Sequence, residues 1–220
     1  MTRRDPLNRE KVLDAALELA AAEGLSGLSM RKLAKALGVE AMALYNHVAN
    51  KNDILKGLAE RVLASVAEPD PALPWAERVR ATAISLHRAL NRHPVVPFVL
   101  TTDKVNPTAL RALRPLDSIV GALYEAGFDD HGVRQAWGAL NSLVFGSLLL
   151  TTAGFTGRPA EEDQTDVYVR QVDPAKLPHF HRVLPALSAG DRDVDFRVAL
   201  DMLISGLVAA APVGSEGMTT

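Results

Sequence analysis

The sequence predicts an all-α protein, and three observations support this fold class. The chain of 220 residues is 48% hydrophobic but only 5% aromatic, a composition typical of helices rich in alanine, leucine and valine. Apolar residues recur at three- and four-residue spacings through most of the chain. No stretch shows the two-residue alternation between turn pairs that is typical of a strand. The length suits one large or two small domains.

Three short helices are predicted in the first part of the chain. Asn8 can cap the first helix, which ends near Gly24, and Ser29 can cap the second. Gly38 follows at once, where a left-handed backbone is favourable only for glycine. The third helix is predicted from about Glu40 to Val48. Apolar residues at helical spacing form the inward faces of these helices: Leu13, Ala16, Leu17, Ala20, Met30, Leu33, Ala34, Leu37, Leu44 and Val48.

The second and third of these helices form a predicted helix-turn-helix unit. Ala34, four positions before Gly38, lets the two helix axes approach, and Leu44, six positions after it, anchors the third helix. Basic, polar and aromatic residues occupy the remaining face. Such a unit inserts its second helix into a DNA groove. The alternative is an ordinary helical hairpin with a solvated charged face.

A connecting helix and a proline-rich boundary follow this unit. The helix begins after Asn50, and Pro69, Pro71 and Pro74 stop it and start the next one. One side of the helix is apolar through Ile54, Leu55, Leu58, Val62 and Val66. The predicted organisation is therefore a helix-turn-helix domain over residues 1–50, a connecting helix over 51–68 and a helical domain over 69–220.

Five further helices are predicted in this last domain. Asn106 with Pro107 is the predicted start of the second of them, and Pro115 is a predicted kink within it. The sequence GFTGRPAEEDQTDVYVRQVDP is a predicted polar loop. The five helices are predicted over about residues 75–92, 106–124, 130–153, 177–187 and 193–211.

Residues 8–66 resemble the N-terminal domain of the tetracycline-repressor (TetR) family of bacterial regulators. The resemblance implies an all-helical dimer that releases DNA when a small ligand enters its C-terminal domain. The block LYNHVANK is particularly close to the tetracycline repressors themselves. The residues that carry the resemblance are Ala15-Ala16, Gly24, Ser29-Met30-Arg31, Leu33-Ala34, Leu37-Gly38-Val39, Leu44-Tyr45-Asn46-His47-Val48, Lys51, Leu55 and Leu58.

The resemblance and side-chain chemistry together predict which residues contact DNA. In the family, the residues that match Tyr45 and Lys51 hold phosphates, and the residue that matches His47 lies near the DNA backbone. Arg31 matches a position that can contact a base, and arginine on guanine is the commonest specific contact. The alternative for Tyr45 is an ordinary core position. The predicted DNA-binding residues are Ser29, Arg31, Ala41, Met42, Tyr45, Asn46, His47 and Lys51.

The start of the recognition helix departs from the tetracycline repressors. Ala41, Met42 and Ala43 offer no side-chain hydrogen bond to a base edge, so they can only touch thymine methyl groups or fit the shape of the groove. The operator sequence is therefore not implied by the resemblance. Arg3 and Arg4 can form a basic arm for the minor groove, and the alternative is a disordered terminus.

The helical domain after residue 69 resembles the family's ligand-binding and dimerisation domain more loosely. The resemblance implies a four-helix homodimer interface from helices at about 130–153 and 193–211. A small-molecule pocket among the middle helices is predicted, although each lining residue is individually a candidate for ordinary core. The predicted lining residues are Leu86, Leu90, Phe98, Leu116, Leu123, Trp137, Asn141, Val144, Phe145 and Phe180.

The histidines give no reason to expect a metal or another cofactor. The tetracycline repressors hold a magnesium–drug chelate partly through a histidine that this chain lacks in the matching stretch PVVPFVL. His93 is predicted as a helix C-cap residue. His179 and His181 diverge if their segment is helical, and spacing places no third ligand beside them.

Bulk properties limit the function classes that remain. Residues 1–66 carry a net charge of +2 and the rest −4, so the basic charge is concentrated where the motif lies. The chain has no cysteine, which excludes thiol redox sensing and cysteine-ligated zinc. No leader or membrane-spanning run is evident, so we expect a bacterial cytoplasmic protein. The main enzyme motifs are absent, and the remaining alternative is a constitutive or activating DNA-binding regulator without a small ligand.

Overall fold

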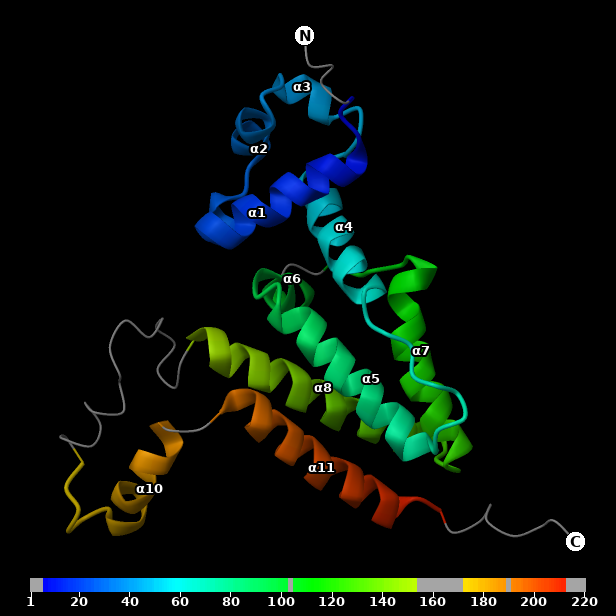
Figure 1. Cartoon of the computed structure of the whole chain (residues 1–220), viewed down its shortest axis with the longest axis vertical. Helices are drawn as coiled ribbons and strands as arrows, with labels where there is room; N and C mark the ends of the chain where they lie inside the picture. Colours follow the sequence, from blue (N-terminus) through cyan, green and yellow to red (C-terminus); the bar gives the residue numbers. More distant parts are fainter. Residues whose placement is uncertain (1–5, 103–104, 154–171, 189–190, 213–220) are drawn as a thin grey trace, which may run out of the picture. The chain divides into compact units, whose positions relative to one another are not determined.

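The structure, a computed structural model, describes residues 6–102, 105–153, 172–188 and 191–212. Helices are the only regular elements among these residues (Figure 1). The chain divides into two compact units, Met1–Glu125 and Ala126–Thr220. The all-α fold class predicted from the sequence is confirmed. None of the described helices is both long and apolar enough to cross a membrane.

The first unit contains the helix-turn-helix elements and the four helices that follow them. Its helices are α1 (Arg9–Gly27), α2 (Met30–Leu37), α3 (Ala41–Leu44), α4 (Lys51–Ala64), α5 (Trp75–Asn91), α6 (Val95–Thr102) and α7 (Leu110–Glu125). The second unit contains α8 (Asp130–Ala153), α10 (Pro178–Ser188) and α11 (Arg192–Ala210).

Local sequence sets the ends of the first helices as predicted. The Asn8 side chain accepts a hydrogen bond from the backbone N–H of Lys11 and caps α1. Ser29 caps α2 in the same way through the N–H of Lys32. Gly38 ends α2 in the left-handed conformation, with φ 64°. Gly24, at φ 71°, interrupts the regular part of α1 near the predicted end of that helix.

Two helix predictions need correction. The third helix was expected to reach Val48, but α3 ends at Leu44 and a turn covers residues 45–47. The segment after Pro94, for which no helix was predicted, forms α6. Its Pro97 lies in the first turn, where a missing N–H removes no helical hydrogen bond.

The start of α7 is also different from the prediction. Asn106 and Pro107 do not start this helix, which begins at Leu110. The predicted helices over about 75–92, 130–153, 177–187 and 193–211 agree with α5, α8, α10 and α11 to within about two residues. Most of the predicted polar loop lies outside the described residues, as do Arg3 and Arg4.

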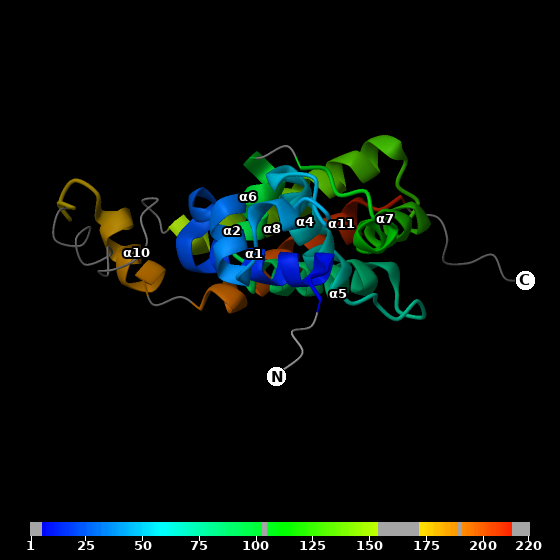
Figure 2. The same ribbon diagram turned by 90° about the horizontal axis from the view of Figure 1, so that it is seen from above.

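The core of the first unit forms around α4. Helix α4 packs against α1, α5, α6 and α7, and α5 packs against α7. Fully buried leucines on three of these helices, Leu58, Leu90 and Leu123, show where the helices meet. Helices α1 and α2 lie side by side (Figure 1 and Figure 2). The helix-turn-helix elements are thus supported by α1 and α4.

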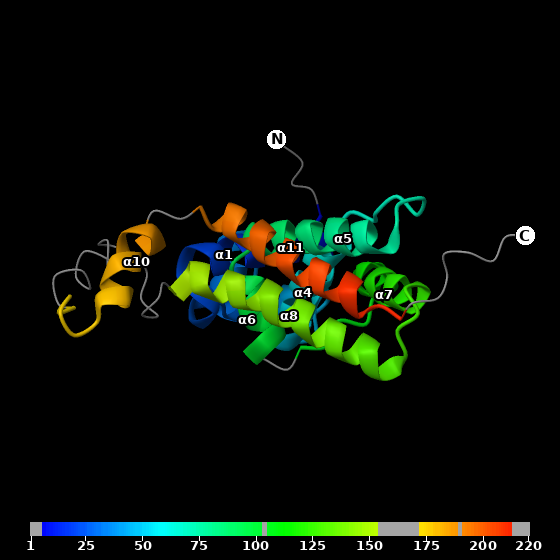
Figure 3. The same cartoon turned by 90° about the horizontal axis from the view of Figure 1, so that it is seen from below.

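In the second unit, α8 and α11 lie side by side along most of their length (Figure 1 and Figure 3). Each contributes buried apolar residues at helical spacing. On α8 these include Val133, Leu140 and Leu148, and on α11 they include Phe196, Leu200 and Ile204.

Candidate nucleic-acid interface

Helix α3 and the turn after it expose the side chains expected to reach DNA. Met42 is 75% exposed and Tyr45 is 48% exposed, so Tyr45 is not a core residue. Leu44, between them, is fully buried, and Val48 is almost fully buried. Arg31 on α2 and Asn46 in the turn are exposed. The apolar anchor Leu44 therefore faces inward, and the polar side chains face solvent together with Met42.

The other predicted contact residues are half-buried: Ser29, Ala41, His47 and Lys51. The Ser29 hydroxyl is engaged in capping α2. The Lys51 ammonium, at the first position of α4, donates to the Leu25 carbonyl at 3.0 Å. An ammonium has three N–H donors, so this bond leaves Lys51 able to donate to a phosphate as well. The positive end of the α4 helix dipole also lies here, at the N-terminus of the helix, and attracts phosphate.

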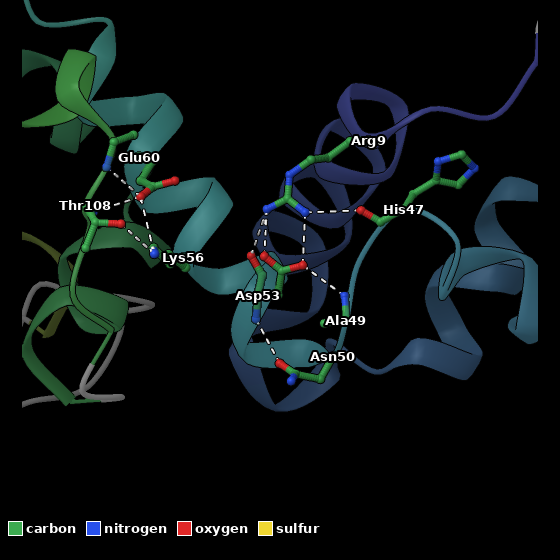
Figure 4. Close-up of polar contacts among 9 residues, drawn as sticks. Arg9, His47, Ala49, Asn50, Asp53, Lys56, Glu60 and Thr108 are labelled. Atoms are coloured by element: carbon green, nitrogen blue, oxygen red, sulfur yellow. Dashed lines mark hydrogen bonds and ion pairs between the residues drawn. The ribbon is translucent and has the colours of Figure 1, made fainter.

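An ion pair that the sequence analysis missed holds the turn between α3 and α4 (Figure 4). The Arg9 guanidinium donates to both carboxylate oxygens of Asp53, at 2.7 and 2.9 Å, and to the His47 carbonyl at 3.1 Å. The same carboxylate accepts the backbone N–H of Ala49 at 2.9 Å. Asn50 caps α4 through the N–H of Asp53. The backbone on both sides of Val48 is therefore fixed by one charged pair.

This pair stays charged at neutral pH. The hydrogen bonds from Arg9, helped by the N–H of Ala49, lower the pKa of Asp53 to about 2, although partial burial acts in the opposite direction. The hydrogen bond with Asp53 correspondingly raises the pKa of Arg9. The partners are 44 residues apart in sequence, and no spacing rule connects them.

Helices α1 and α4 cross along a seam in which the charges are reversed from one end to the other. Asp53, Gly57 and Arg61 recur every four residues on α4. At one end Asp53 pairs with Arg9 of α1, and at the other Arg61 pairs with Asp14 of α1. Between them a Cβ on Gly57 would lie 2.8 Å from Cδ2 of Leu13, so a larger residue would force the Leu13 side chain to shift. The seam therefore fixes both the separation and the register of the two helices.

A second polar contact joins α4 to the start of α7 (Figure 4). One Glu60 carboxylate oxygen accepts the backbone N–H groups of Thr108 and Ala109, at 2.8 and 2.9 Å. The Lys56 ammonium donates to the Thr108 hydroxyl at 2.7 Å. Glu60 thus supplies the N-terminal cap of α7 from another helix, which explains why α7 begins after Thr108 and not at Asn106.

The residues predicted to line a ligand pocket divide between the two units. Leu86, Leu90 and Leu123 are buried where α5 packs on α7, and Phe98 and Leu116 in the same unit are half-buried. In the second unit Val144 is buried, and Trp137, Asn141, Phe145 and Phe180 are half-buried. The Asn141 amide donates to the Trp137 carbonyl within α8.

Helix α11 carries an exposed apolar stripe in addition to its buried one. Val194, Val198, Met202 and Val208 are all exposed. On the helices expected to pair, a Cβ added to Gly138, Gly146 or Gly206 would meet nothing within 4 Å. These glycines therefore face open space, and residues this small would permit another helix to approach closely.

The histidines lie at separate places. The C-cap of α5 is Arg92, one residue before the predicted His93, whose pKa is lowered by burial and then by Arg61 and Arg92. His179 and His181 lie on α10, where a helix directs them apart. In the described part of the chain, no group of three metal-ligating side chains occurs.

The fold and this surface define the class as a helix-turn-helix DNA-binding regulator. Comparisons with known proteins agree. Residues 12–58 match the family described as bacterial regulatory proteins, tetR family, and residues 68–211 match the tetracyclin repressor-like C-terminal domain. The chain belongs to the TetR family of transcriptional regulators. Proteins of this family are repressors that bind DNA, and they are not enzymes.

Individual relatives are similar over nearly the whole chain. Tetracycline repressor protein class D of Escherichia coli is 33% identical over 212 residues, which cover 91% of this chain and 88% of that repressor. A possible TetR family transcriptional regulator from Streptomyces coelicolor A3(2) has a TM-score of 0.78 and 31% identity, covering 92% of this chain and 100% of that one. The Streptomyces coelicolor TetR family protein ActR, in complex with actinorhodin, has a TM-score of 0.76 and 27% identity, covering 94% and 99%.

Proposed function

We propose that this protein is a ligand-responsive transcriptional repressor that binds a palindromic operator as a homodimer and is released by a small, largely apolar effector. The observation that carries the proposal is the surface of α2, α3 and the following turn. Its apolar anchors, Leu44 and Val48, are buried, while Arg31, Met42, Tyr45 and Asn46 are exposed on the elements that a helix-turn-helix protein inserts into DNA.

Direct base contacts are few in this proposal. Arg31 pairs with a guanine, and Tyr45 and Asn46 reach the groove or its edge. Ala41 and Met42 select by contact with thymine methyl groups and by groove shape. Ser29, His47 and Lys51 contact the phosphate backbone, which positions the protein without selecting a sequence.

Dimerisation supplies the second set of contacts. Residues 1–66 carry a net charge of only +2, so one copy would bind DNA weakly. Pairing of α8 and α11 with their copies would cover the exposed apolar stripe on α11 and double the number of phosphate contacts. Two-fold symmetry then requires an operator with half-sites about one helical turn apart, or a multiple of it.

The effector is proposed to be apolar because nine of the ten residues that the sequence predicts as pocket residues are hydrophobic: Leu86, Leu90, Phe98, Leu116, Leu123, Trp137, Val144, Phe145 and Phe180, with Asn141 as the polar member. A complex of the related ActR with actinorhodin supports an organic ligand in this class of domain. A magnesium–tetracycline chelate is not expected, since the stretch PVVPFVL has no histidine.

Selection of DNA by the purified full-length protein tests the proposal. The protein would be incubated with a library of randomised duplexes, and retained molecules would be sequenced. We expect an inverted repeat that two protomers protect. Failure to enrich any sequence at low salt would contradict DNA-binding specificity. A screen of organic compounds for release of the selected duplex would follow, and operator binding that no compound relieves would favour a regulator without an effector.

A further inference from the structure

We propose that Arg9 is a positioning residue for DNA binding: its guanidinium, forked on Asp53 and bonded to the His47 carbonyl, holds the turn between α3 and α4 in the shape that presents Tyr45 and Lys51 to DNA. This inference rests on the proposed DNA binding. It assigns a role to two side chains that are not themselves placed in contact with the nucleic acid.

The first argument is the position of the contacts. Arg9 holds the carbonyl of His47, and Asp53 holds the N–H of Ala49, so the pair grips the chain on both sides of Val48 (Figure 4). Tyr45 and Asn46 lie just before these two bonded positions, and Lys51 lies just after them. A change in the turn would therefore move two sets of DNA contacts relative to each other.

The second argument is the geometry of the pair. Both Arg9–Asp53 bonds are short and parallel, and a bidentate arginine fixes orientation as well as distance. The side chains are 40% and 27% exposed, so solvent screens part of their attraction, whereas the two-bond geometry still fixes how they are oriented. A pair with such strict geometry is suited to positioning.

The third argument is that α1 and α4 also pack through contacts that do not involve Arg9. Leu13 lies against Gly57 in the middle of the seam, and Arg61 pairs with Asp14 and Glu10 at its far end. We therefore expect loss of Arg9 to release the turn while these contacts keep the two helices packed. Arg61 provides a matched control, since its side chain is 41% exposed and joins the same two helices through Glu10 and Asp14, which lie on α1 and not in the turn.

The experiment compares four variants of the full-length protein: Arg9→Gln, Arg9→Lys, Asp53→Asn and Arg61→Gln. The probes are the duplex that the wild-type protein selects from a randomised library and a scrambled duplex of equal length. Dissociation constants would be measured over a series of salt concentrations, and thermal unfolding of each variant would be followed by circular dichroism.

We expect Arg9→Gln to weaken binding to the selected duplex about ten-fold or more, and to lower the slope of log K against log salt by about 1, because Lys51 loses its phosphate alignment. Arg9→Lys should also weaken binding. Lysine keeps the charge but cannot bond to both oxygens of Asp53 while it holds the His47 carbonyl. Arg61→Gln should bind within about two-fold of the wild type. Its melting temperature should change by a small amount, similar to the change in Arg9→Gln.

Asp53→Asn separates positioning from simple charge. This change removes a negative charge beside the DNA-binding surface, so electrostatics alone predicts tighter binding. If the two-bond contact between Arg9 and Asp53 positions the turn, its loss should instead weaken binding. Equal or tighter binding by Asp53→Asn, or full activity of Arg9→Lys, would overturn the positioning role. A wild-type protein that selects no duplex at all would contradict the proposed function itself, a result distinct from either of these.

Discussion

Each compact unit has an apolar core, but the two units differ in the contacts that accompany this core. In the first unit, charged side chains cross between helices: Arg9 to Asp53, Arg61 to Asp14, and Glu60 to the backbone before α7. In the second unit, α8 and α11 share a buried apolar stripe, and α11 exposes a second one. Directional bonds fix geometry, whereas apolar surface drives association. The difference suggests that the first unit is built to hold a shape and the second to acquire a partner.

The largest effect is expected where that partner would lie. Val198→Glu places a charge in the exposed stripe of α11, where the valine is 47% exposed. If the stripe is the dimer interface, an unpaired buried carboxylate should convert dimers to monomers and abolish tight operator binding. Sedimentation velocity measures the oligomeric state.

Val183→Glu on α10 is the matched control for this change. Val183 is 41% exposed and receives the same substitution, but it lies outside the proposed interface helices. The assembly of this variant should be unaffected. A Val198→Glu protein that remains dimeric would show that the stripe on α11 is not the interface.

The next effect concerns the helix-turn-helix unit, where two neighbouring apolar residues should behave differently. Leu44 is fully buried, so Leu44→Ala should lower the free energy of unfolding by about 3 kcal/mol through lost burial and a cavity. Met42→Ala, at an exposed position, should change stability by less than about 0.5 kcal/mol. Chemical denaturation measures both values.

For DNA binding, Met42→Ala is the substitution of interest, because it should change sequence preference without changing stability. Met42→Ala should leave folding intact but relax selection for a thymine in the groove, which a repeat of the duplex selection would detect. An unchanged sequence preference in Met42→Ala would remove this residue from the proposed readout.

How much could be predicted from sequence follows the same division between local and distant interactions. Asn8, Ser29 and Gly38 act within one helix turn, and all three occupy their predicted places. The early end of α3 was missed, and one contact to the turn at residues 45–47, the bond from Arg9 to the His47 carbonyl, comes from far away in sequence. The start of α7 was misplaced because its cap is Glu60 of α4 and not the adjacent Asn106.

The candidate site shows the same limit. Side chains expected on the free face, such as Met42 and Tyr45, followed from helical spacing and from family resemblance, and both are exposed. Arg9 and Asp53, which set the geometry of that face, carry no local signal. Sequence patterns report which face of a helix is free, but a contact across 44 residues appears only in three dimensions.

A smaller effect is expected at the N-terminus of α4. Lys51→Ala removes one proposed phosphate contact and should weaken binding to selected and scrambled duplexes alike, with a decrease of about 1 in the salt slope. The Lys51 bond to the Leu25 carbonyl is also lost, so thermal unfolding must be measured in parallel. Equal affinity and an unchanged salt slope would contradict the phosphate role of Lys51.

The smallest effect should appear at the trans cap of α7. Glu60→Ala removes an acceptor shared by two backbone N–H groups and should cost about 1 kcal/mol of folding free energy, the usual effect of losing a helix cap. Glu60→Gln should recover part of this loss, because its amide oxygen can still accept. The control is Glu77→Ala, which breaks the ion pair with Arg80 within α5 and removes an acidic residue from the first turn of that helix, and which should change stability by about 0.5 kcal/mol. Equal losses at Glu60 and Glu77 would mean that the contact between α4 and α7 is no stronger than an ordinary surface pair, and that directional bonds between helices do not distinguish the first unit.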